Sequence, residues 1–134
     1  MKKNGFTLVE LLAVIVILAL LLTIAVPNVI SISQRIRKNM YCSKLENIES
    51  AAKIYGQDYI DDISSTERIR VSKLIDNNIY KKEDKNCVLG NSNKPCVKDP
   101  RNNSMMDYDL ITITIKDKRI YAEYDSSKKS VCNE

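Results

Sequence analysis

Residues 6–26 read FTLVELLAVIVILALLLTIAV, and Pro27 closes this apolar run. Glu10 is the one ionisable residue in it. About 20 consecutive apolar residues are enough for a helix to cross a lipid bilayer. The run therefore predicts a transmembrane helix near the N-terminus. It also explains why a chain with 44% hydrophobic residues has a mean hydropathy of only -0.26, because the rest of the chain is polar.

The remaining composition excludes several classes of enzyme. The 134 residues include no histidine and no tryptophan. This removes histidine as a general base, the nucleophile pairs that depend on it, and histidine metal motifs. We therefore expect no enzyme active site, no cofactor and a single small head. The net charge of +4 does not indicate any particular class of binding partner. No basic stripe interleaved with aromatic residues is visible, so the sequence does not support direct nucleic-acid binding.

The residues before the apolar run indicate its orientation. Residues 1–5, MKKNG, are short and positive, which favours a cytoplasmic N-terminus and an extracytoplasmic head. Arg35, Arg37 and Lys38 follow on the other side and weaken this signal. A secretory signal peptide would have a shorter apolar region and a small-residue cleavage site, and residues 24–28, IAVPN, are a poor one. A plain single-pass anchor remains an alternative.

Glu10 is unexpected inside an apolar run. A carboxylate costs about 2–3 kcal/mol at the centre of a bilayer and less near its surface. One interpretation is an interfacial carboxylate that reaches back to headgroups or to Lys2 and Lys3. The other is a carboxylate that awaits a cation from another subunit.

Residues 2–10, KKNGFTLVE, together with the long apolar run and Pro27, resemble the N-terminal signature of type IV pilins and pseudopilins. The resemblance implies that a prepilin peptidase cuts between Gly5 and Phe6 and that the new amine of Phe6 is methylated. It implies that Glu10 pairs with the Phe6 amine of an adjacent subunit during assembly. It also implies a proline, here Pro27, at the end of the first helical segment. The expected divisions are a leader at 1–5, a transmembrane and polymerisation helix at 6–27 and a pilin head at 28–134.

Helical spacing of apolar residues continues beyond Pro27. We predict an amphipathic helix over 28–62, joined to the apolar run and open to a kink at Pro27. Its stripe shifts once, near Met40 and Tyr41, and we expect it to pack on the head as core. The stripe consists of Val29, Ile32, Ile36, Met40, Tyr41, Leu45, Ile48, Ala52, Tyr55, Tyr59 and Ile63.

The rest of the head, 63–134, is predicted as loops and an antiparallel hairpin. A short helix is expected over 72–78, a polar loop over 81–107, and strands over 108–116 and 119–124 around a tight turn at Asp117 and Lys118. The predicted fold is α+β, with a long N-terminal helix packed on a small antiparallel sheet. This order resembles, less specifically, the heads of small pilin-like proteins of Gram-positive bacteria.

Four cysteines follow the apolar run, where an extracytoplasmic location permits disulfides. Four cysteines allow three pairings. Cys87 and Cys96 flank a short stretch with turn residues. A bond between Cys42 and Cys132 would resemble the way in which related pilins hold their C-termini, so we expect these two pairs. The spacing of the cysteines offers no zinc site.

Some major pseudopilins carry calcium in a loop comparable to 99–109. The oxygen ligands available here would be Asp99, Asn102, Asn103, Asp107 and Asp109. Their spacing does not match an EF-hand, so we expect a solvated loop and no metal.

The resemblance implies a structural subunit of a type IV pilus-like filament. The chain would sit in the cell membrane as a single-pass protein and then enter an extracellular or wall-spanning filament. Its partners would be the prepilin peptidase, an inner-membrane assembly platform and other pilins, the same or different. A pilus, a DNA-uptake system and a type II secretion-like system all remain open. The alternative is an unprocessed single-pass membrane protein with a small extracellular binding head.

Overall fold

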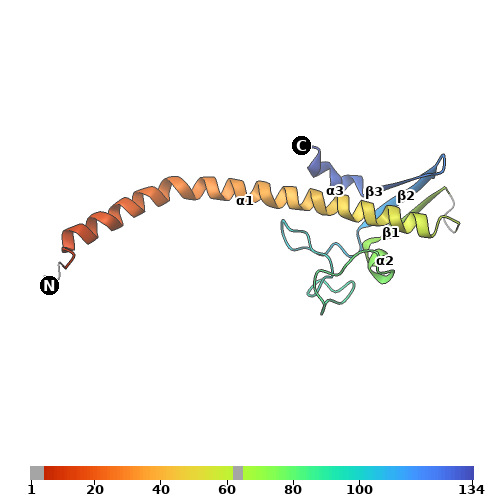
Figure 1. The fold of residues 1–134 in the computed structure, drawn as a ribbon, viewed down its shortest axis with the longest axis horizontal. Coiled ribbons are helices and arrows are strands. Elements are labelled where there is room, and N and C mark those ends of the chain that lie inside the picture. The colour runs from red at the N-terminus through yellow and green to blue at the C-terminus, as the bar shows by residue number, and fades with distance from the viewer. Residues whose placement is uncertain (1–4, 62–64) are drawn as a thin grey trace. The chain divides into compact units, whose positions relative to one another are not determined.

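The computed structural model describes residues 5–61 and 65–134, without the side chain of Pro27. These residues form a long helix, a small antiparallel sheet and short helices (Figure 1). The elements in chain order are α1 (Leu8–Asp58), β1 (Thr66–Arg70), α2 (Val71–Asp76), β2 (Leu110–Lys116), β3 (Arg119–Tyr124), α3 (Ser126–Lys129) and a 3-10 helix (Ser130–Cys132). The α+β prediction is confirmed.

Helix α1 has 51 residues and runs without a break through Pro27. The chain divides into two compact units, one up to Ile36 and one from Arg37 to Glu134, and we call the second the head. The helix ends at Asp58, earlier than the predicted end at 62. The reason is that Tyr59 is the last described residue of the stripe to pack against the core, whereas Ile60 is 41% exposed. The predicted stripe residue Ile63 lies outside the described residues.

The N-terminal unit presents apolar side chains in every direction. Successive residues such as Ile15, Val16, Ile17 and Leu18 are each at least half exposed. Exposure of this extent requires lipid or other protein chains as a cover. Of the helices in the described residues, α1 is the one that is long and apolar enough to cross a membrane, a test that an N-terminal signal sequence also passes.

The predicted apolar stripe divides at Met40. From Tyr41 to Tyr55 its members are buried and Tyr59 is partly buried against the same core, so the prediction of core packing is confirmed for this part. Before that point the prediction is wrong, because these side chains are more than half exposed. A shift of one residue turns the apolar face by about 100° around a helix of 3.6 residues per turn, which separates the two halves of the stripe. The exposed members are Val29, Ile32, Ile36 and Met40.

The sheet has the order β1-β2-β3 and is antiparallel throughout. Its hairpin matches the prediction closely, and Asp117 and Lys118 both have positive φ at the tight turn. Strand β1 was not predicted. It pairs with β2 so that Ile69 lies opposite Ile111, which in turn lies opposite Tyr124. All three of these side chains are buried, so one face of the sheet belongs to the core.

The core of the head forms where α1, the sheet and α2 meet (Figure 1). Helix α2 corresponds to the short helix predicted at 72–78 but ends at Asp76 with Asn77 as its C-cap, and Asn78 beyond it has a φ of 56°. The segment at 81–107 has neither helix nor strand, as predicted, yet it supplies core residues that the sequence did not indicate. These are Cys96, Val97 and Met106, each at most 2% exposed.

Candidate processing and assembly site

The predicted cleavage position lies just before α1. Phe6 is 84% exposed, and apart from Gly5 and its two chain neighbours no atom of the described chain lies within 4 Å of the place where a side chain on Gly5 would begin. The peptide between these two residues is therefore free of packing by the rest of the described chain. An enzyme could reach it without unfolding α1.

Thr7 and Glu10 form a reciprocal cap at the start of α1. The Thr7 backbone N–H donates to Glu10 Oε2 at 2.9 Å, and the Thr7 hydroxyl donates to the same oxygen at 3.0 Å. The Glu10 backbone N–H donates to Thr7 Oγ1 at 3.3 Å. This is a capping box, which satisfies two otherwise unpaired amides of the first helical turn. Its signal in the sequence is a threonine three residues before a glutamate, T-L-V-E, and neither interpretation of Glu10 included it.

The capping box changes what Glu10 can do. Its carboxylate has hydrogen-bond donors within its own chain, so neither a lysine nor another subunit is needed to orient it. Both hydrogen bonds from Thr7 go to Oε2 of Glu10. The pairing of the Glu10 carboxylate with a second subunit stays a prediction. Lys2 and Lys3, the other predicted partners, lie outside the described residues. Pro27, the remaining predicted assembly residue, lies inside α1 and does not end it.

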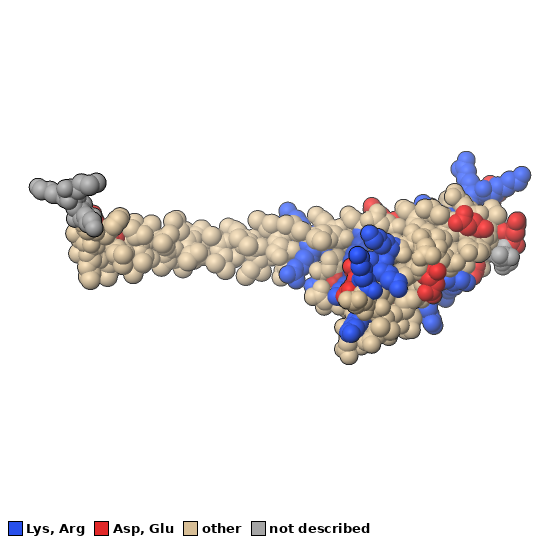
Figure 2. Space-filling model, turned by 60° about the horizontal axis from the view of Figure 1, so that its bottom comes forward, with Lys and Arg blue, Asp and Glu red and all other residues tan. Residues whose placement is uncertain are grey.

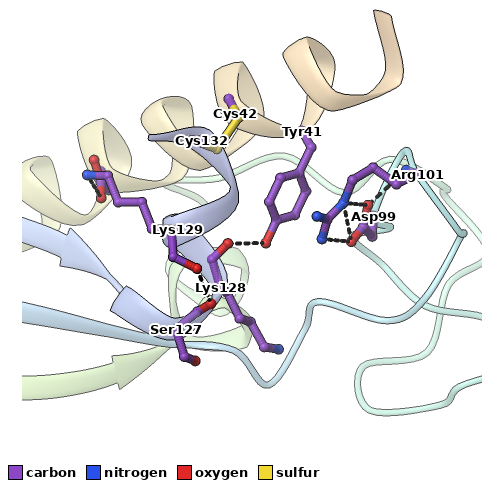
Figure 3. The surroundings of a disulfide bond; sticks show 10 residues. Tyr41, Cys42, Asp99, Arg101, Ser127, Lys128, Lys129 and Cys132 are labelled. Atoms are coloured by element: carbon purple, nitrogen blue, oxygen red, sulfur yellow. Dashed lines mark hydrogen bonds and ion pairs between the residues drawn. A yellow bond between two sulfur atoms is a disulfide. The ribbon is translucent and has the colours of Figure 1, made fainter. Parts of the chain in front are cut away.

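The structure places both predicted cysteine pairs at disulfide distance. Cys42 on α1 and Cys132 in the 3-10 helix have sulfurs 2.07 Å apart (Figure 3). Cys87 and Cys96 have sulfurs 1.98 Å apart and close a short loop. The first pair holds the C-terminal segment against α1.

Polar contacts hold the same C-terminal segment, residues 126–132. The Tyr41 hydroxyl donates to the backbone oxygen of Lys128 at 3.2 Å, and Lys129 Nζ lies 2.7 Å from Glu49 Oε1 (Figure 3). Lys128 also forms an ion pair with Asp109. Glu49 and Asp109 are largely buried, with side chains 12% and 10% exposed. The two lysines therefore neutralise acids that would otherwise be costly to bury.

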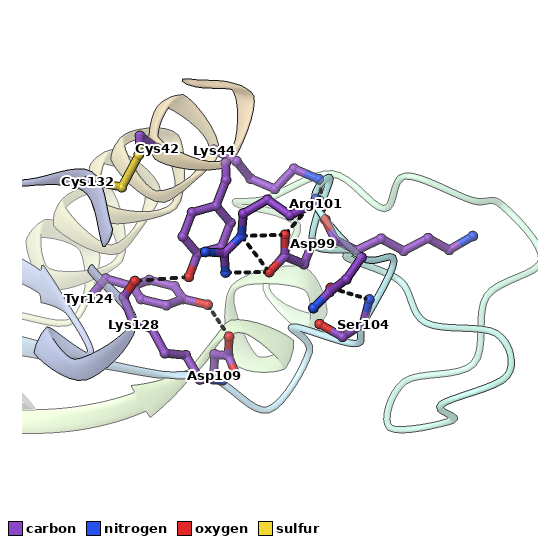
Figure 4. Close-up of polar contacts among 12 residues, drawn as sticks. Cys42, Lys44, Asp99, Arg101, Ser104, Asp109, Tyr124, Lys128 and Cys132 are labelled. Carbon is purple, nitrogen blue, oxygen red and sulfur yellow. Dashed lines mark hydrogen bonds and ion pairs between the residues drawn. A yellow bond between two sulfur atoms is a disulfide. The ribbon is translucent and has the colours of Figure 1, made fainter. Parts of the chain in front are cut away.

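Tyrosine hydroxyls take part in this network. The Tyr124 hydroxyl donates to Asp109 at 2.5 Å (Figure 4). Burial and this bond raise the pKa of Tyr124 above its usual value. Burial also raises the pKa of Tyr41, although the nearby Arg101 opposes the rise. Both hydroxyls therefore stay protonated as donors.

Asp99 and Arg101 form a close pair beside Tyr41. Two guanidinium nitrogens reach the Asp99 carboxylate, the shorter contact being 2.7 Å, and the guanidinium carbon lies 3.5 Å from the centre of the Tyr41 ring (Figure 3). Burial raises the pKa of Asp99, but the hydrogen bonds from Arg101 outweigh it and leave that pKa below its usual value. Asp99 is thus held as an anion.

The acidic side chains that could have served as calcium ligands are engaged elsewhere. Asp107 is fully buried, and its carboxylate accepts backbone N–H groups of Gly90, Cys96 and Val97 at 2.7 to 3.2 Å. Asp99 faces Arg101 and Asp109 faces Lys128. The expectation of a solvated loop is therefore wrong for Asp99 and Asp107, which are 4% and 0% exposed. Within residues 5–61 and 65–134 no group of three histidine, cysteine or acidic side chains could hold a metal ion.

Comparisons with known proteins agree with the N-terminal pattern. Residues 1–26 match the family described as "Prokaryotic N-terminal methylation motif". The chain is also similar to Competence protein ComGC of Bacillus subtilis (strain 168), with 45% identity over 51 residues, which is 38% of this chain. It spans about half, 51%, of that relative's length. No solved structure matches the chain. The methylation motif, the apolar helix that follows it and the similarity to a competence protein over part of the chain support a type IV pilin-like protein.

Proposed function

We propose that the chain is a structural subunit of a type IV pilus-like filament. A prepilin peptidase would cut it between Gly5 and Phe6, the Phe6 amine would be methylated, and the subunit would assemble through α1. The head would face away from the cytoplasm. The resemblance points to a structural role and not to a catalytic one.

The observation that carries this proposal is the exposed apolar surface of the helix residues that follow the predicted cleavage position in the chain. A helix that is apolar on all sides is stable only inside lipid or among other apolar helices. A membrane protein needs the first environment. A filament subunit needs both in succession, because neighbouring helices replace the lipid when the subunit leaves the membrane.

Charge pairing would set the register of such a bundle. In the filament core, the new Phe6 amine and the Glu10 carboxylate would both leave water. Opposite charges attract far more strongly in that environment than in water, and an unpaired one is costly. The capping box holds the Glu10 side chain at the helix start, where an amine from a neighbouring chain can meet it.

Similarity to a competence protein favours a DNA-uptake filament over the other two systems. A deletion strain would then lose most natural transformation while protein secretion continues. Unchanged transformation, with loss of secretion or surface adhesion, would assign the filament to one of those systems instead.

Sheared surface material tests whether filaments exist. We expect the wild-type chain in the sheared fraction, and Gly5→Leu to leave an uncut precursor in the membrane. Because a side chain on Gly5 meets open space, this substitution does not strain the fold. Gly5→Ala is the matched control and adds only one methyl group. A wild-type chain that is confined to the membrane would instead support the single-pass alternative.

A further inference from the structure

A groove in the head combines an apolar floor with a cationic rim. Ile75, Ile79 and Tyr80 contribute its apolar surface, and the rim consists of Lys81, Lys82 and Lys85. All three lysines are exposed, and Asn78 completes the lining, which contains no acid. The groove therefore suits an apolar group that carries negative charge.

Neighbouring acids do not neutralise this rim. The Glu83 carboxylate faces Lys44 and accepts the backbone N–H of Lys98, and the Asp84 carboxylate accepts the backbone N–H of Asn86. In the described part of the chain, none of the three rim lysines forms an ion pair. The three cations next to the apolar surface are therefore available to pair with an acid from another chain.

The end of α1 has the complementary chemistry. Asp58, Ile60 and Asp61 form a short exposed turn, which we call the acidic turn. Its isoleucine is 41% exposed and lies between the two carboxylates in sequence. Neither aspartate forms an ion pair with another residue of the described ranges.

We propose that the groove of one head receives the acidic turn of another copy of this chain. Ile60 would lie on the apolar floor, and Asp58 and Asp61 would meet the rim lysines. Figure 2 shows several lysine and arginine side chains gathered in the middle of the head, and both acidic and basic side chains at its right-hand end. Because the contact joins two different surfaces, it repeats from copy to copy, and a contact of this type that does not close builds a helical filament.

This inference rests on the proposed function, since it needs neighbouring heads in a filament. Three full-length variants test it by charge exchange. The first carries Lys81→Glu, Lys82→Glu and Lys85→Glu, the second carries Asp58→Lys and Asp61→Lys, and the third carries all five substitutions. A control replaces three exposed lysines elsewhere: Lys94→Glu, Lys116→Glu and Lys118→Glu.

Expressed alone, the first and second variants should each lose filament yield by at least about tenfold, since each places like charges opposite one another. The third variant should regain filaments. Co-expression of the first and second variants should also regain them, because each supplies the surface that fits the other. The control should assemble like the wild type.

Carbodiimide treatment of wild-type filaments gives an independent measurement, because it joins lysine and carboxylate groups that are in contact. Filaments mixed from ¹⁵N-labelled and unlabelled chains should yield cross-links between different copies that join the groove to the acidic turn. Normal filament yield from the first two variants, or loss without rescue, would overturn the inference. If the wild type itself forms no filaments, the proposed function fails first, so the two failures are distinct.

Discussion

At the scale of single residues, Glu10 and the buried acids of the head are held by specific donors. Glu10 accepts from Thr7 at the start of α1, and Asp107 accepts three backbone N–H groups in the core. The first contact follows from a four-residue pattern and is readable in the sequence. The second needs amides that lie ten and more residues before Asp107, which no local pattern reveals.

Substitutions of Glu10 show whether filament assembly needs its negative charge or only its role in the capping box. We expect Glu10→Ala and Glu10→Gln to be inserted and cut normally, because Gly5 and Phe6 are unchanged. Both should give far fewer filaments, because the Phe6 amine would enter the core without its counter-charge, at a cost of several kcal/mol. The ratio of sheared to membrane-bound chain measures this. Glutamine retains an oxygen for the capping box, so normal assembly of Glu10→Gln alone would mean that the cap matters and the charge does not.

Asp107 organises the segment that carries Cys96. Asp107→Asn replaces an acceptor oxygen with a donor facing backbone N–H groups, and we expect a loss of about 2–4 kcal/mol in the free energy of unfolding. Asp84→Asn is the control, because that side chain is exposed and caps a single N–H group. Urea unfolding of the detergent-solubilised chain, followed by tyrosine circular dichroism, compares the two. Equal losses would contradict the role given to Asp107.

The pair of Asp99 and Arg101 makes stability depend on pH. Because the pKa of Asp99 in the folded chain is lowered from 3.8, its ionised form stabilises the fold at neutral pH, and this contribution is lost as the pH falls through the lowered value. We therefore expect Arg101→Gln to be less stable than the wild type at pH 7. The difference in unfolding free energy between Arg101→Gln and the wild type should become smaller below about pH 3.8. Denaturant unfolding at several pH values measures this difference. A difference that grows as the pH falls would contradict the stabilising role of the Asp99–Arg101 pair.

At the scale of elements, patterns that repeat along the chain were predictable. The apolar run and the helical stripe predicted α1, and alternating isoleucines and threonines predicted β2 of the hairpin. Strand β1 was missed because its five residues bury a single side chain, Ile69, and its partner strand begins at Leu110. Helix α3 was missed because Ser126–Lys129 contains no apolar residue. It is held by Lys128 and Lys129, whose acidic partners are distant in sequence.

The two cysteine pairs should contribute different amounts to the free energy of unfolding. Residues 42 and 132 are separated by 90 positions, whereas 87 and 96 are separated by 9. Loop-closure entropy gives about 4.5 kcal/mol for the first bond and about 2.7 kcal/mol for the second. We expect Cys42→Ser with Cys132→Ser to lower the unfolding free energy more than Cys87→Ser with Cys96→Ser. Denaturation of both variants tests the order, and peptide mapping without reductant tests the pairing. A larger loss for Cys87→Ser with Cys96→Ser would show that strain in the folded state or residual structure in the unfolded state outweighs loop-closure entropy.

At the scale of the whole molecule, the two units have different surfaces. The N-terminal unit exposes large apolar side chains around the helix over residues 11–26, whereas the head buries its own core and pairs its own buried acids. The head can therefore fold as one body, while the N-terminal unit requires lipid or other chains. Composition alone indicated an apolar N-terminal helix followed by a polar head, with the head beginning at residue 28, whereas the boundary between the two compact units of the structure lies at Ile36 and Arg37. Sequence alone could not predict which head surfaces meet, because the groove and the acidic turn come from residues that only the fold brings to the surface together.

We propose that this chain is a processed filament subunit, and intact mass measurement of the chain recovered from sheared filaments tests the proposed processing. We predict a chain that begins at Phe6 and carries one methyl group on its N-terminal amine. A chain that still begins at Met1, without methylation, in cells that display filaments would contradict the account.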